Sequence, residues 1–339
     1  MSAREQHLSR PAESITVERR TIGGLLEAMG RTGFQGRSLA AALDVLVRMI
    51  EEEENTIFLG YAGSMSTTGQ SRIIRWLLEN RFVDVLVGTG ANLSEDVFEG
   101  LGFRYYQGTH LADDAELLKH RIDRFYDVYA DELEYRQLES FIGEFIGTLA
   151  AGSVHSSADF LRRFGEYQLE RGVESITAAA ARVGVPVFSP GLADSGYGVA
   201  ATLYAREHGH AVVLDQFADF RQLAEIGERS RKTSVIYIGG GVPKDTIQLV
   251  TVMVDLVRGG DEPAPHAYAV QITTDSPQWG GLSGCTFEEA VSWGKIDERA
   301  ARAVCYCDAT IALPILAHAL LERGVERTSA PDLSWLAVG

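Results

Sequence analysis

Short apolar runs alternate with amphipathic stretches along most of the chain. Residues 56–61 and 83–89 are continuous apolar runs of the length that buried parallel strands have. Small and polar residues follow each run, and residues 73–78 then place apolar side chains at helical spacing. Similar short runs occur at 185–188, 211–214, 234–238 and 268–273. Strands alternating with helices are typical of parallel βαβ units, so the pattern predicts an α/β fold: a single large Rossmann-like domain with a mostly parallel, doubly wound sheet and added helices.

The same pattern indicates where this domain begins and ends. Residues 1–20 are polar and charged, which predicts a flexible N-terminal arm, and residues 331–339 are expected to form a C-terminal tail. Residues 21–330 then form one domain, because neither an internal repeat nor a low-complexity linker divides them. Within it, residues 38–54 and 114–150 have helical spacing, and no proline interrupts the second stretch.

The charge balance is strongly acidic. The 31 basic and 47 acidic residues give a net charge of −16. Nucleic acids and anionic membranes both require a basic surface, so we expect neither as a partner. Cationic small molecules such as polyamines would be attracted, although acidity also serves solubility alone. No run of about 18 apolar residues occurs, so we expect no segment that spans a membrane.

The cysteines indicate the redox compartment. There are three, Cys285, Cys305 and Cys307. Their odd number and C-x-C spacing fit neither a disulfide framework nor a zinc site. We therefore expect a reducing, cytoplasmic environment and no metal site.

Loops rich in small residues follow three of the predicted strands. They are residues 62–69, 89–91 and the glycine triplet at 239–241. In open parallel sheets, ligands bind beyond the carboxyl ends of the strands, and small residues there let the backbone approach a phosphate. No G-x-G-x-x-G or P-loop signature occurs, and each loop alone is more often a structural turn. Three such loops on one sheet favour a nucleotide site.

Lysine is rare in this chain, and one lysine lies in an apolar segment. The four lysines are Lys119, Lys232, Lys244 and Lys295. Lys295 follows Glu289 and Trp293, which are one helical turn apart. A lysine in this setting is often a surface residue whose apolar stem is covered. Burial beside an aromatic ring would instead favour a neutral, nucleophilic amine.

Four segments carry a resemblance to a known family. They are Phe58–Tyr61, Val83–Val87, Gly239–Lys244 and Glu289–Ile296, the last of which reads E-A-V-S-W-G-K-I. The chain resembles deoxyhypusine synthase and its descendant, homospermidine synthase, in register from residue 40 to residue 320. The E-A-V-S-W-G-K-I block is highly specific, and the glycine triplet adds to it.

The resemblance implies a fold, a cofactor and a set of site residues. Residues 21–330 would be a deoxyhypusine synthase-like NAD-binding domain in a homotetramer, a dimer of dimers with NAD sites at the dimer interface. The cofactor-binding positions carried over are Gly63, Ser64, Met65, Ser66, Thr67, Thr89, Gly90, Ala91, Glu95, Asp194, Gly240, Thr274, Asp275, Asp308 and Ala309. The catalytic positions are Lys295, which carries the aminobutyl group in the family, Glu95 and Glu289.

Several positions around the substrate depart from the family's pattern. Val199, Trp279 and Leu282 replace acidic residues, and Asp245 stands where the family has a histidine. Removing one partner of a buried ammonium–carboxylate pair costs roughly 3–5 kcal/mol, so these changes favour a related amine or one with an apolar end over spermidine in its usual pose. The residues expected to contact this substrate are Trp293, Asp245, Gly280 and Leu282.

The activity implied by the resemblance is an NAD-dependent aminoalkyl transfer. A 4-aminobutyl group would pass from a polyamine to a small amine through an imine held covalently on Lys295, as in homospermidine synthesis. Three alternatives remain. The acceptor could be a protein lysine, as in deoxyhypusine synthase proper. The chain could oxidise or rearrange a different amine with NAD and without group transfer, or it could be a non-catalytic oligomer that retains only NAD binding.

Overall fold

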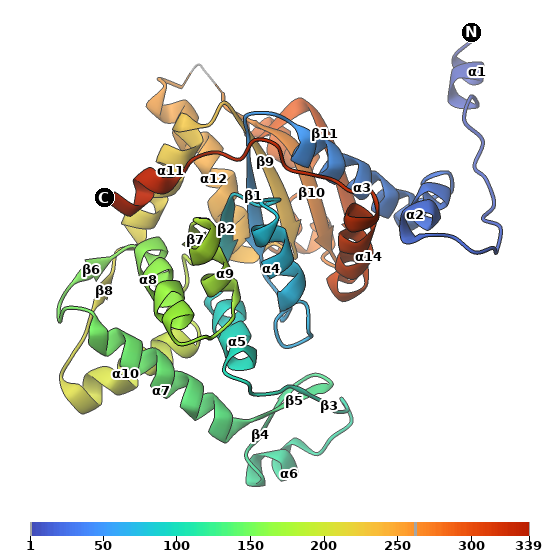
Figure 1. Cartoon of the computed structure of the whole chain (residues 1–339). Helices are drawn as coiled ribbons and strands as arrows, with labels where there is room; N and C mark the ends of the chain where they lie inside the picture. The colour runs from blue at the N-terminus through green and yellow to red at the C-terminus, as the bar shows by residue number, and fades with distance from the viewer. Residues whose placement is uncertain (1, 261–262, 339) are drawn as a thin grey trace.

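The apolar runs form the centre of a six-stranded sheet (Figure 1). The computed structural model describes residues 2–260 and 263–338. Every pair of neighbouring strands runs parallel, and every residue of the first two strands is buried. The prediction of an α/β fold with a doubly wound parallel sheet is confirmed. The strands are β1 (Asn55–Tyr61), β2 (Val85–Gly88), β7 (Val187–Phe188), β9 (Lys232–Ile238), β10 (His266–Thr273) and β11 (Ile296–Tyr306).

The order of the strands locates a crevice. Across the sheet the order is β11-β10-β9-β1-β2-β7, so the chain builds outward from β1 in one direction and later from β9 in the other. Where the winding direction changes, the loops after the two central strands lead to helices on opposite faces, which leaves room for a ligand at the carboxyl ends. That place lies beyond Tyr61 and Ile238.

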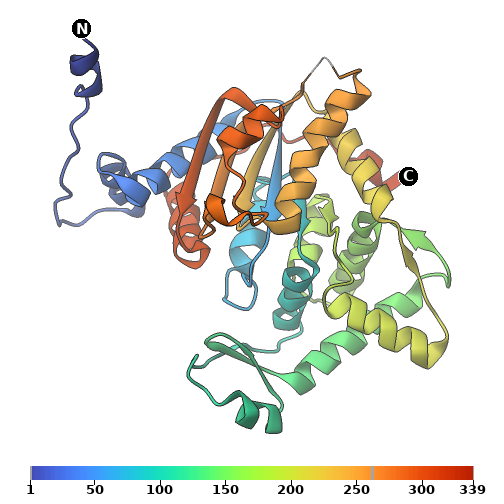
Figure 2. The ribbon, with the colours of Figure 1, turned by 180° about the vertical axis from the view of Figure 1, so that it is seen from behind.

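Helices cover both faces of the sheet, because both faces of a parallel sheet must be buried. One face carries α3 (Phe34–Glu51), α4 (Ser71–Glu79) and α14 (Ala309–Glu322), with α2 (Ile22–Gly30) and α9 (Ile176–Val183) beside them. The other face carries α11 (Gln216–Arg229), α12 (Gly241–Val257) and α13 (Phe287–Ser292), as Figure 2 shows from behind. Helix α8 (Ser157–Glu170) packs beside β7 at the edge.

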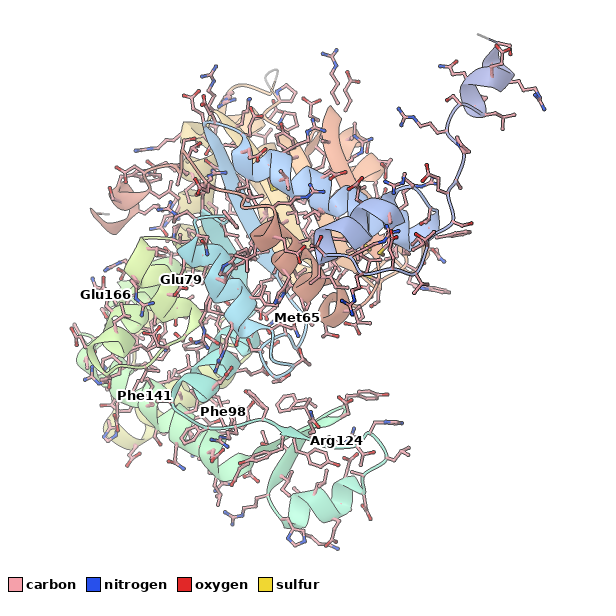
Figure 3. The ribbon with its side chains drawn as sticks, turned by 45° about the vertical axis from the view of Figure 1, so that its right-hand side comes forward. Met65, Glu79, Phe98, Arg124, Phe141 and Glu166 are labelled. Carbon is pink, nitrogen blue, oxygen red and sulfur yellow. The ribbon has the colours of Figure 1, made fainter. Side chains whose placement is uncertain are left out.

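A smaller group of elements extends beyond the carboxyl ends of the strands (Figures 1 and 3). It begins at the end of α5 (Gly90–Gly100), where Phe98 stacks on Tyr135 with ring centroids 4.6 Å apart. Helices α7 (Glu132–Thr148) and α10 (Gly196–His208) pack against each other beside it. The remaining elements of this group are β3 (Tyr106–Gln107), α6 (Asp114–Lys119), β4 (Ile122–Phe125) and β5 (Val128–Asp131).

The helical spacing predicted over residues 114–150 is only partly confirmed, because the stretch does not form one continuous helix. An antiparallel hairpin of β4 and β5 separates α6 from α7. Arg121 and Tyr126 adopt positive φ angles of 56°, which ends the first helix and turns the hairpin. Asp131 then caps α7 by accepting the Leu133 N–H at 2.8 Å. Turn and cap residues therefore outweigh the helical spacing of the aromatic side chains.

Two further elements differ from the sequence prediction. The run at 211–214 is not part of the main sheet, because β8 (Val213–Leu214) pairs only with β6 (Val154–His155) in a separate two-stranded sheet. The edge strand β11 was not predicted. Its sequence contains Asp297, Glu298 and Arg299, and an edge strand tolerates such charges because one side of it faces solvent.

The two ends of the chain behave differently. Residues 2–19 are exposed throughout, including the short helix α1 (Ala3–His7), and they lead away from the sheet (Figure 1). Near the C-terminus, the chain forms the short helix η2 (Ser334–Val338). The Cζ atom of Arg229 lies 4.0 Å from the centroid of the Trp335 ring in this helix. In the described part of the chain, no helix is both long and apolar enough to cross a membrane.

A buried ion pair fastens the segment after α14 to the sheet. Arg327 Nη2 lies 3.0 Å from Asp84 Oδ2, and the side chains are 2% and 0% exposed. The guanidinium also donates to the carbonyls of Ile50 and Asn55, while Asp84 accepts the Ile57 N–H at 2.9 Å. Burial raises the pKa of Asp84 to about 6 even though Arg327 opposes the shift. The pair therefore ties the chain end to the start of β1.

We expect Arg327→Met to lower the free energy of unfolding by about 3 kcal/mol at neutral pH, because it leaves the buried Asp84 charge with only Arg81, 3.5 Å away, as an ion-pair partner. The loss should shrink as the pH falls toward about 5.5, because a raised carboxyl pKa means that protonation favours the folded state. Urea unfolding at several pH values measures both effects. The exposed pair of Arg136 with Glu132 gives the control: Arg136→Met should cost less than about 1 kcal/mol. Equal losses for the two variants would contradict this account.

Candidate functional site

The loops after β1 and β9 meet at the crevice. The Ala62 N–H donates to the carbonyl of Ile238 at 3.1 Å, which holds the start of the first loop beside the end of β9. Gly239 has a φ of 70°, and a Cβ there would lie 3.3 Å from the Ala62 carbonyl oxygen. The glycine is therefore required both by its conformation and by the close approach of the two loops. Two of the predicted cofactor loops are thus adjacent.

Asn92 joins the predicted cofactor loop 63–67 to the predicted loop 89–91. Its Oδ1 accepts the N–H groups of Met65 at 3.0 Å and Ser66 at 3.2 Å, and its Nδ2 donates to Thr89 Oγ1 at 3.0 Å and to the Gly63 carbonyl. Asn92 is 1% exposed. The sequence prediction did not assign it a role. A signal was available, because an asparagine in the first turn of a helix after a buried strand often bonds to the backbone.

The N-terminus of α5 can receive an anion. Thr89 is its N-cap residue and makes no side-chain capping bond to the helix. The first N–H groups of a helix lack intrahelical acceptors and carry partial positive charge, so an uncapped end favours a phosphate. A Cβ on Gly90 would lie 2.6 Å from Ser195 Oγ and 2.9 Å from the Leu192 carbonyl oxygen. The loop that contains Asp194 therefore packs directly against the start of α5.

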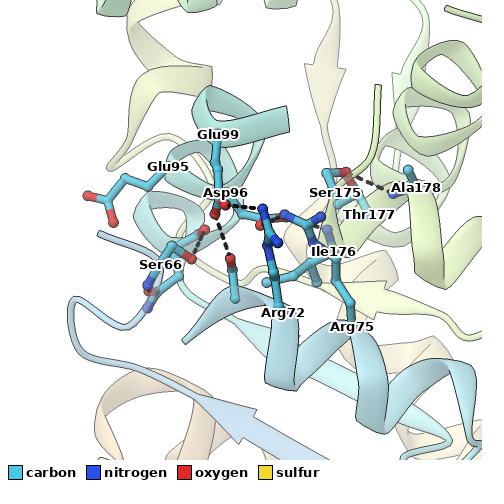
Figure 4. A network of polar contacts seen from close by, with 12 residues as sticks. Ser66, Arg72, Arg75, Glu95, Asp96, Glu99, Ser175, Ile176, Thr177 and Ala178 are labelled. Carbon is cyan, nitrogen blue, oxygen red and sulfur yellow. Dashed lines mark hydrogen bonds and ion pairs between the residues drawn. The ribbon is translucent and has the colours of Figure 1, made fainter. Parts of the chain in front are cut away.

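Of the acidic residues on α5, two are engaged in structural pairs (Figure 4). Asp96 is fully buried, pairs with Arg75 at 2.6 Å and accepts the Ile176 N–H. Glu99 contacts Arg72 at 3.0 Å and Ser71 Oγ at 3.2 Å. These contacts tie α5 to α4 and α9.

The third carboxylate of α5, Glu95, points away from these pairs in Figure 4. Within residues 2–260 and 263–338, its carboxylate has no hydrogen-bond or ion-pair partner. Burial raises the pKa of Glu95 to about 7. A carboxylate that is desolvated and unpaired beside a crevice is a candidate for binding or proton transfer. This position fits the role that the sequence resemblance gave to Glu95.

The segment that carries Lys295 folds as a short helix and a turn. Thr286 caps α13 by accepting the Glu289 N–H at 3.0 Å. Gly294 has a φ of 68°, and the Lys295 N–H returns to the Ala290 carbonyl at 3.0 Å, which closes the helix end. The Lys295 Nζ then lies 4.9 Å from the centroid of the Trp293 ring. The predicted aromatic neighbour is present, although the lysine is only half-buried in one chain.

The position of Lys295 along the sheet differs from that of the cofactor loops. Its carbonyl accepts the His266 N–H at 3.0 Å, so its main chain lies at the amino end of β10, whereas Thr274 and Asp275 follow the other end. In the described ranges, no hydrogen bond or ion pair joins Lys295 to Glu95. The main chain of Lys295 and the cofactor loops therefore lie toward opposite ends of the strands.

The predicted residues Asp245, Glu289 and Lys295 do converge with one another. All three charges reach the ammonium of Lys244: burial lowers its pKa, Asp245 and Glu289 oppose that shift, and Lys295 adds to it. Glu289 and Lys295 also lie within electrostatic reach of the Cys285 thiol. The substrate side of the predicted site is thus a cluster between the first turn of α12 and helix α13.

The remaining predicted residues lie at the surface. Asp194, Thr274 and Asp275 are exposed loop residues after β7 and β10, and the Asp308 carboxylate caps α14 by accepting the Thr310 N–H at 2.7 Å. Around the substrate cluster, the exposed side chains include Trp279 at 80%, Trp293 at 65% and Leu282 at 48%. Large apolar side chains so exposed commonly mark a surface that contacts a ligand or another subunit.

Comparison with known proteins identifies the family. The family model for deoxyhypusine synthase matches residues 24–320. The chain is 45% identical to a probable deoxyhypusine synthase 2 of Methanosarcina mazei, over 96% of this chain and 94% of that protein. It is 36% identical to a deoxyhypusine synthase-like protein of Chlorobaculum parvum, over 91% of this chain and 89% of that protein.

A solved structure agrees at the level of the fold. A crystal structure assigned to deoxyhypusine synthase of Entamoeba histolytica superposes with a TM-score of 0.62, covering 94% of this chain and 100% of that chain at 16% identity. The family model and the curated relatives span nearly the whole chain. The chain therefore belongs to the deoxyhypusine synthase family.

Proposed function

We propose that this protein is an NAD-dependent aminoalkyl transferase in which Lys295 carries the transferred 4-aminobutyl group of a polyamine. The observation that carries the proposal is the pairing of Lys295 with the Trp293 ring inside the E-A-V-S-W-G-K-I block. Glu289 and Asp245 lie in the same cluster, where their charges would attract the ammonium groups of a substrate. The acidic chain as a whole favours a cationic substrate.

The crevice fits a dinucleotide. The uncapped end of α5 offers N–H groups to a phosphate, and Asn92 holds the first loop against the second. Gly90 and Gly240 let the neighbouring residues Leu192 and Ser283 pack closely at the edge of the crevice. The residues proposed to hold NAD are therefore Gly63–Thr67, Thr89–Ala91, Glu95, Asp194, Gly240, Thr274, Asp275, Asp308 and Ala309. Bound NAD would accept a hydride from the carbon beside the secondary amine of the polyamine and return it after transfer.

Lys295 performs the group transfer. Its Nζ attacks the carbon of the oxidised substrate's C=N bond, and the C–N bond to the departing amine breaks as that nitrogen receives a proton. An acceptor amine then attacks the same carbon, and the bond to Nζ breaks in turn. Glu289, whose charge acts on the same cluster, would exchange these protons, and Glu95 would hold an ammonium group or shuttle protons at the crevice.

A second copy of the chain is proposed to complete the site. The main chain of Lys295 lies at the amino end of β10, whereas the cofactor loops lie at the carboxyl ends of the strands. Contact between subunits would bring the Lys295 cluster of one copy over the crevice of its partner and cover Trp279, Leu282 and Trp293. This arrangement agrees with the expected homotetramer, built as a dimer of dimers.

The proposed acceptor is a small amine. The relatives named deoxyhypusine synthase point to a protein lysine as the alternative acceptor. A carboxylate at positions 279 and 282 would hold an ammonium group of the donor, and Trp279 and Leu282 cannot do so. These two side chains therefore favour a donor that has an apolar portion.

Incubation with NAD and a panel of polyamines, followed by borohydride reduction, should add the mass of one aminobutyl group to Lys295. Lys295→Ala should lose both the adduct and turnover, while Lys119→Ala, a change at an exposed lysine remote from the site, should retain them. Intact-protein and peptide mass spectrometry read the adduct. Turnover in wild-type protein without an adduct would favour amine oxidation without transfer.

The pH dependence of kcat/KM for the amine should follow Glu95. If its ionised form holds the substrate ammonium, kcat/KM should fall about tenfold per unit as the pH drops below about 7. Glu95→Gln should lower kcat/KM and remove that limb. Glu99→Gln, one turn along α5 and already paired with Arg72, should leave the limb in place. An unchanged limb in Glu95→Gln would assign it to another group.

Gly90→Ala should weaken NAD binding by at least about tenfold, because the new methyl group meets the Leu192 backbone and must displace the start of α5. Gly191→Ala lies on the neighbouring loop and has open space around it, so it should bind NAD normally. Calorimetric titration with NAD, together with the melting temperature of each variant, separates lost binding from lost folding. Normal NAD affinity in a folded Gly90→Ala variant would contradict the proposed position.

A further inference from the structure

Lys244 is a buried cation that the proposed chemistry does not use directly. It lies in the first turn of α12 and is 1% exposed. Its ammonium donates to Gln271 Oε1 at 2.9 Å, to the Ser283 carbonyl at 3.3 Å and to the Cys285 carbonyl at 2.5 Å. An ammonium has three N–H donors, so these bonds leave none for a substrate. Lys244 therefore acts through the segment that it binds.

Gln271 of β10 extends this connection to the cofactor loop. The side chain is 1% exposed, and its Nε2 donates to the Gly239 carbonyl at 2.9 Å and to the Ser283 carbonyl at 2.8 Å. The glycine triplet and the segment around Ser283 are thus bonded to the same amide. Since both carbonyls are held by buried donors, a shift of either one would break bonds that water cannot readily replace.

The two segments also touch directly. Ser283 Oγ accepts the Gly241 N–H at 3.2 Å, and a Cβ on Gly240 would lie 2.5 Å from the Ser283 Cα. The residues just before are open to solvent: a Cβ on Gly280 or Gly281 would meet no other atom within 4 Å, and Trp279 is 80% exposed. The bonds at 283–285 are therefore where this exposed segment is anchored.

The anchored residues determine where α13 begins. Thr286 caps the helix directly after Cys285, and α13 leads in six residues to the turn that presents Lys295. We propose that Lys244, with Gln271, is a positioning residue that holds residues 279–295 against the cofactor glycines, so that the placement of Glu289 and Lys295 depends on these buried bonds. The effect of Lys244 on catalysis rests on the proposed function, whereas its effect on the position of residues 279–295 does not.

The first test is hydrogen exchange. Lys244→Met removes the three donors with little change in volume, and amides in 279–295 should exchange about tenfold faster while the rest of the protein changes little. Lys232→Met, at an exposed lysine of β9, is the matched control and should leave that segment unchanged. Ser283→Ala removes only the hydroxyl that accepts the Gly241 N–H, and it should give a smaller increase at the same place. It keeps the test decisive should Lys244→Met fail to fold.

The second readout is kinetic. In Lys244→Met, the Kd for NAD should change less than threefold while kcat and the Lys295 adduct fall by about a hundredfold, because the amine is misplaced rather than absent. Exchange that rises evenly over the whole chain, or not at all in 279–295 in either variant, would overturn the proposal. If wild-type protein forms no adduct with any polyamine, the proposed function fails, and the exchange result still decides the role of Lys244.

Discussion

The reversal of strand order between β1 and β9 is the constraint on which the rest of the structure depends. It forces the loops after these strands apart onto opposite faces and opens a crevice at the carboxyl ends. Position 239 requires a glycine because the loops after β1 and β9 lie close together where they leave the sheet. Asn92 is buried because it bonds the loop after β1 to the loop after β2. Near this crevice, Thr89 makes no side-chain capping bond to α5, and in the part of the chain that the structure describes the Glu95 carboxylate has no ion-pair partner.

A second consequence concerns the lysine. Helix α13 leads from the crevice side of the sheet to the amino end of β10, so the main chain of Lys295 lies away from the cofactor loops although its charge acts on Lys244. Within the chain, Lys244, Gln271 and Ser283 bond residues 279–295 to the glycine triplet at 239–241. On the proposed account, a partner subunit then supplies the other half of the site. The exposed Trp279 and Trp293 are what such a contact would cover.

The central strands could be predicted from the sequence because β1, β2 and β9 are largely continuous runs of residues that are buried on both faces. Such runs are typical of strands in the middle of a parallel sheet. The prediction failed at β11, where edge position permits charged residues, and at 114–150, where left-handed residues at Arg121 and Tyr126 break a helical pattern. The specific block around Lys295 identified the family. Lys244 could not be assigned from sequence, because its partners lie 27 to 41 positions away. Asn92 was missed although its place in the first turn of α5 was a signal.

The central claim is that the chain transfers an aminoalkyl group through Lys295 and uses NAD catalytically. The most direct measurement supplies a polyamine deuterated at the carbon beside its secondary amine, together with NAD, and follows the label by mass spectrometry. The account predicts that the transferred group keeps its deuterium in the product and that no reduced cofactor accumulates. Deuterium in accumulated NADH, in amounts equal to the amine consumed, would contradict it and assign the chain to simple amine oxidation.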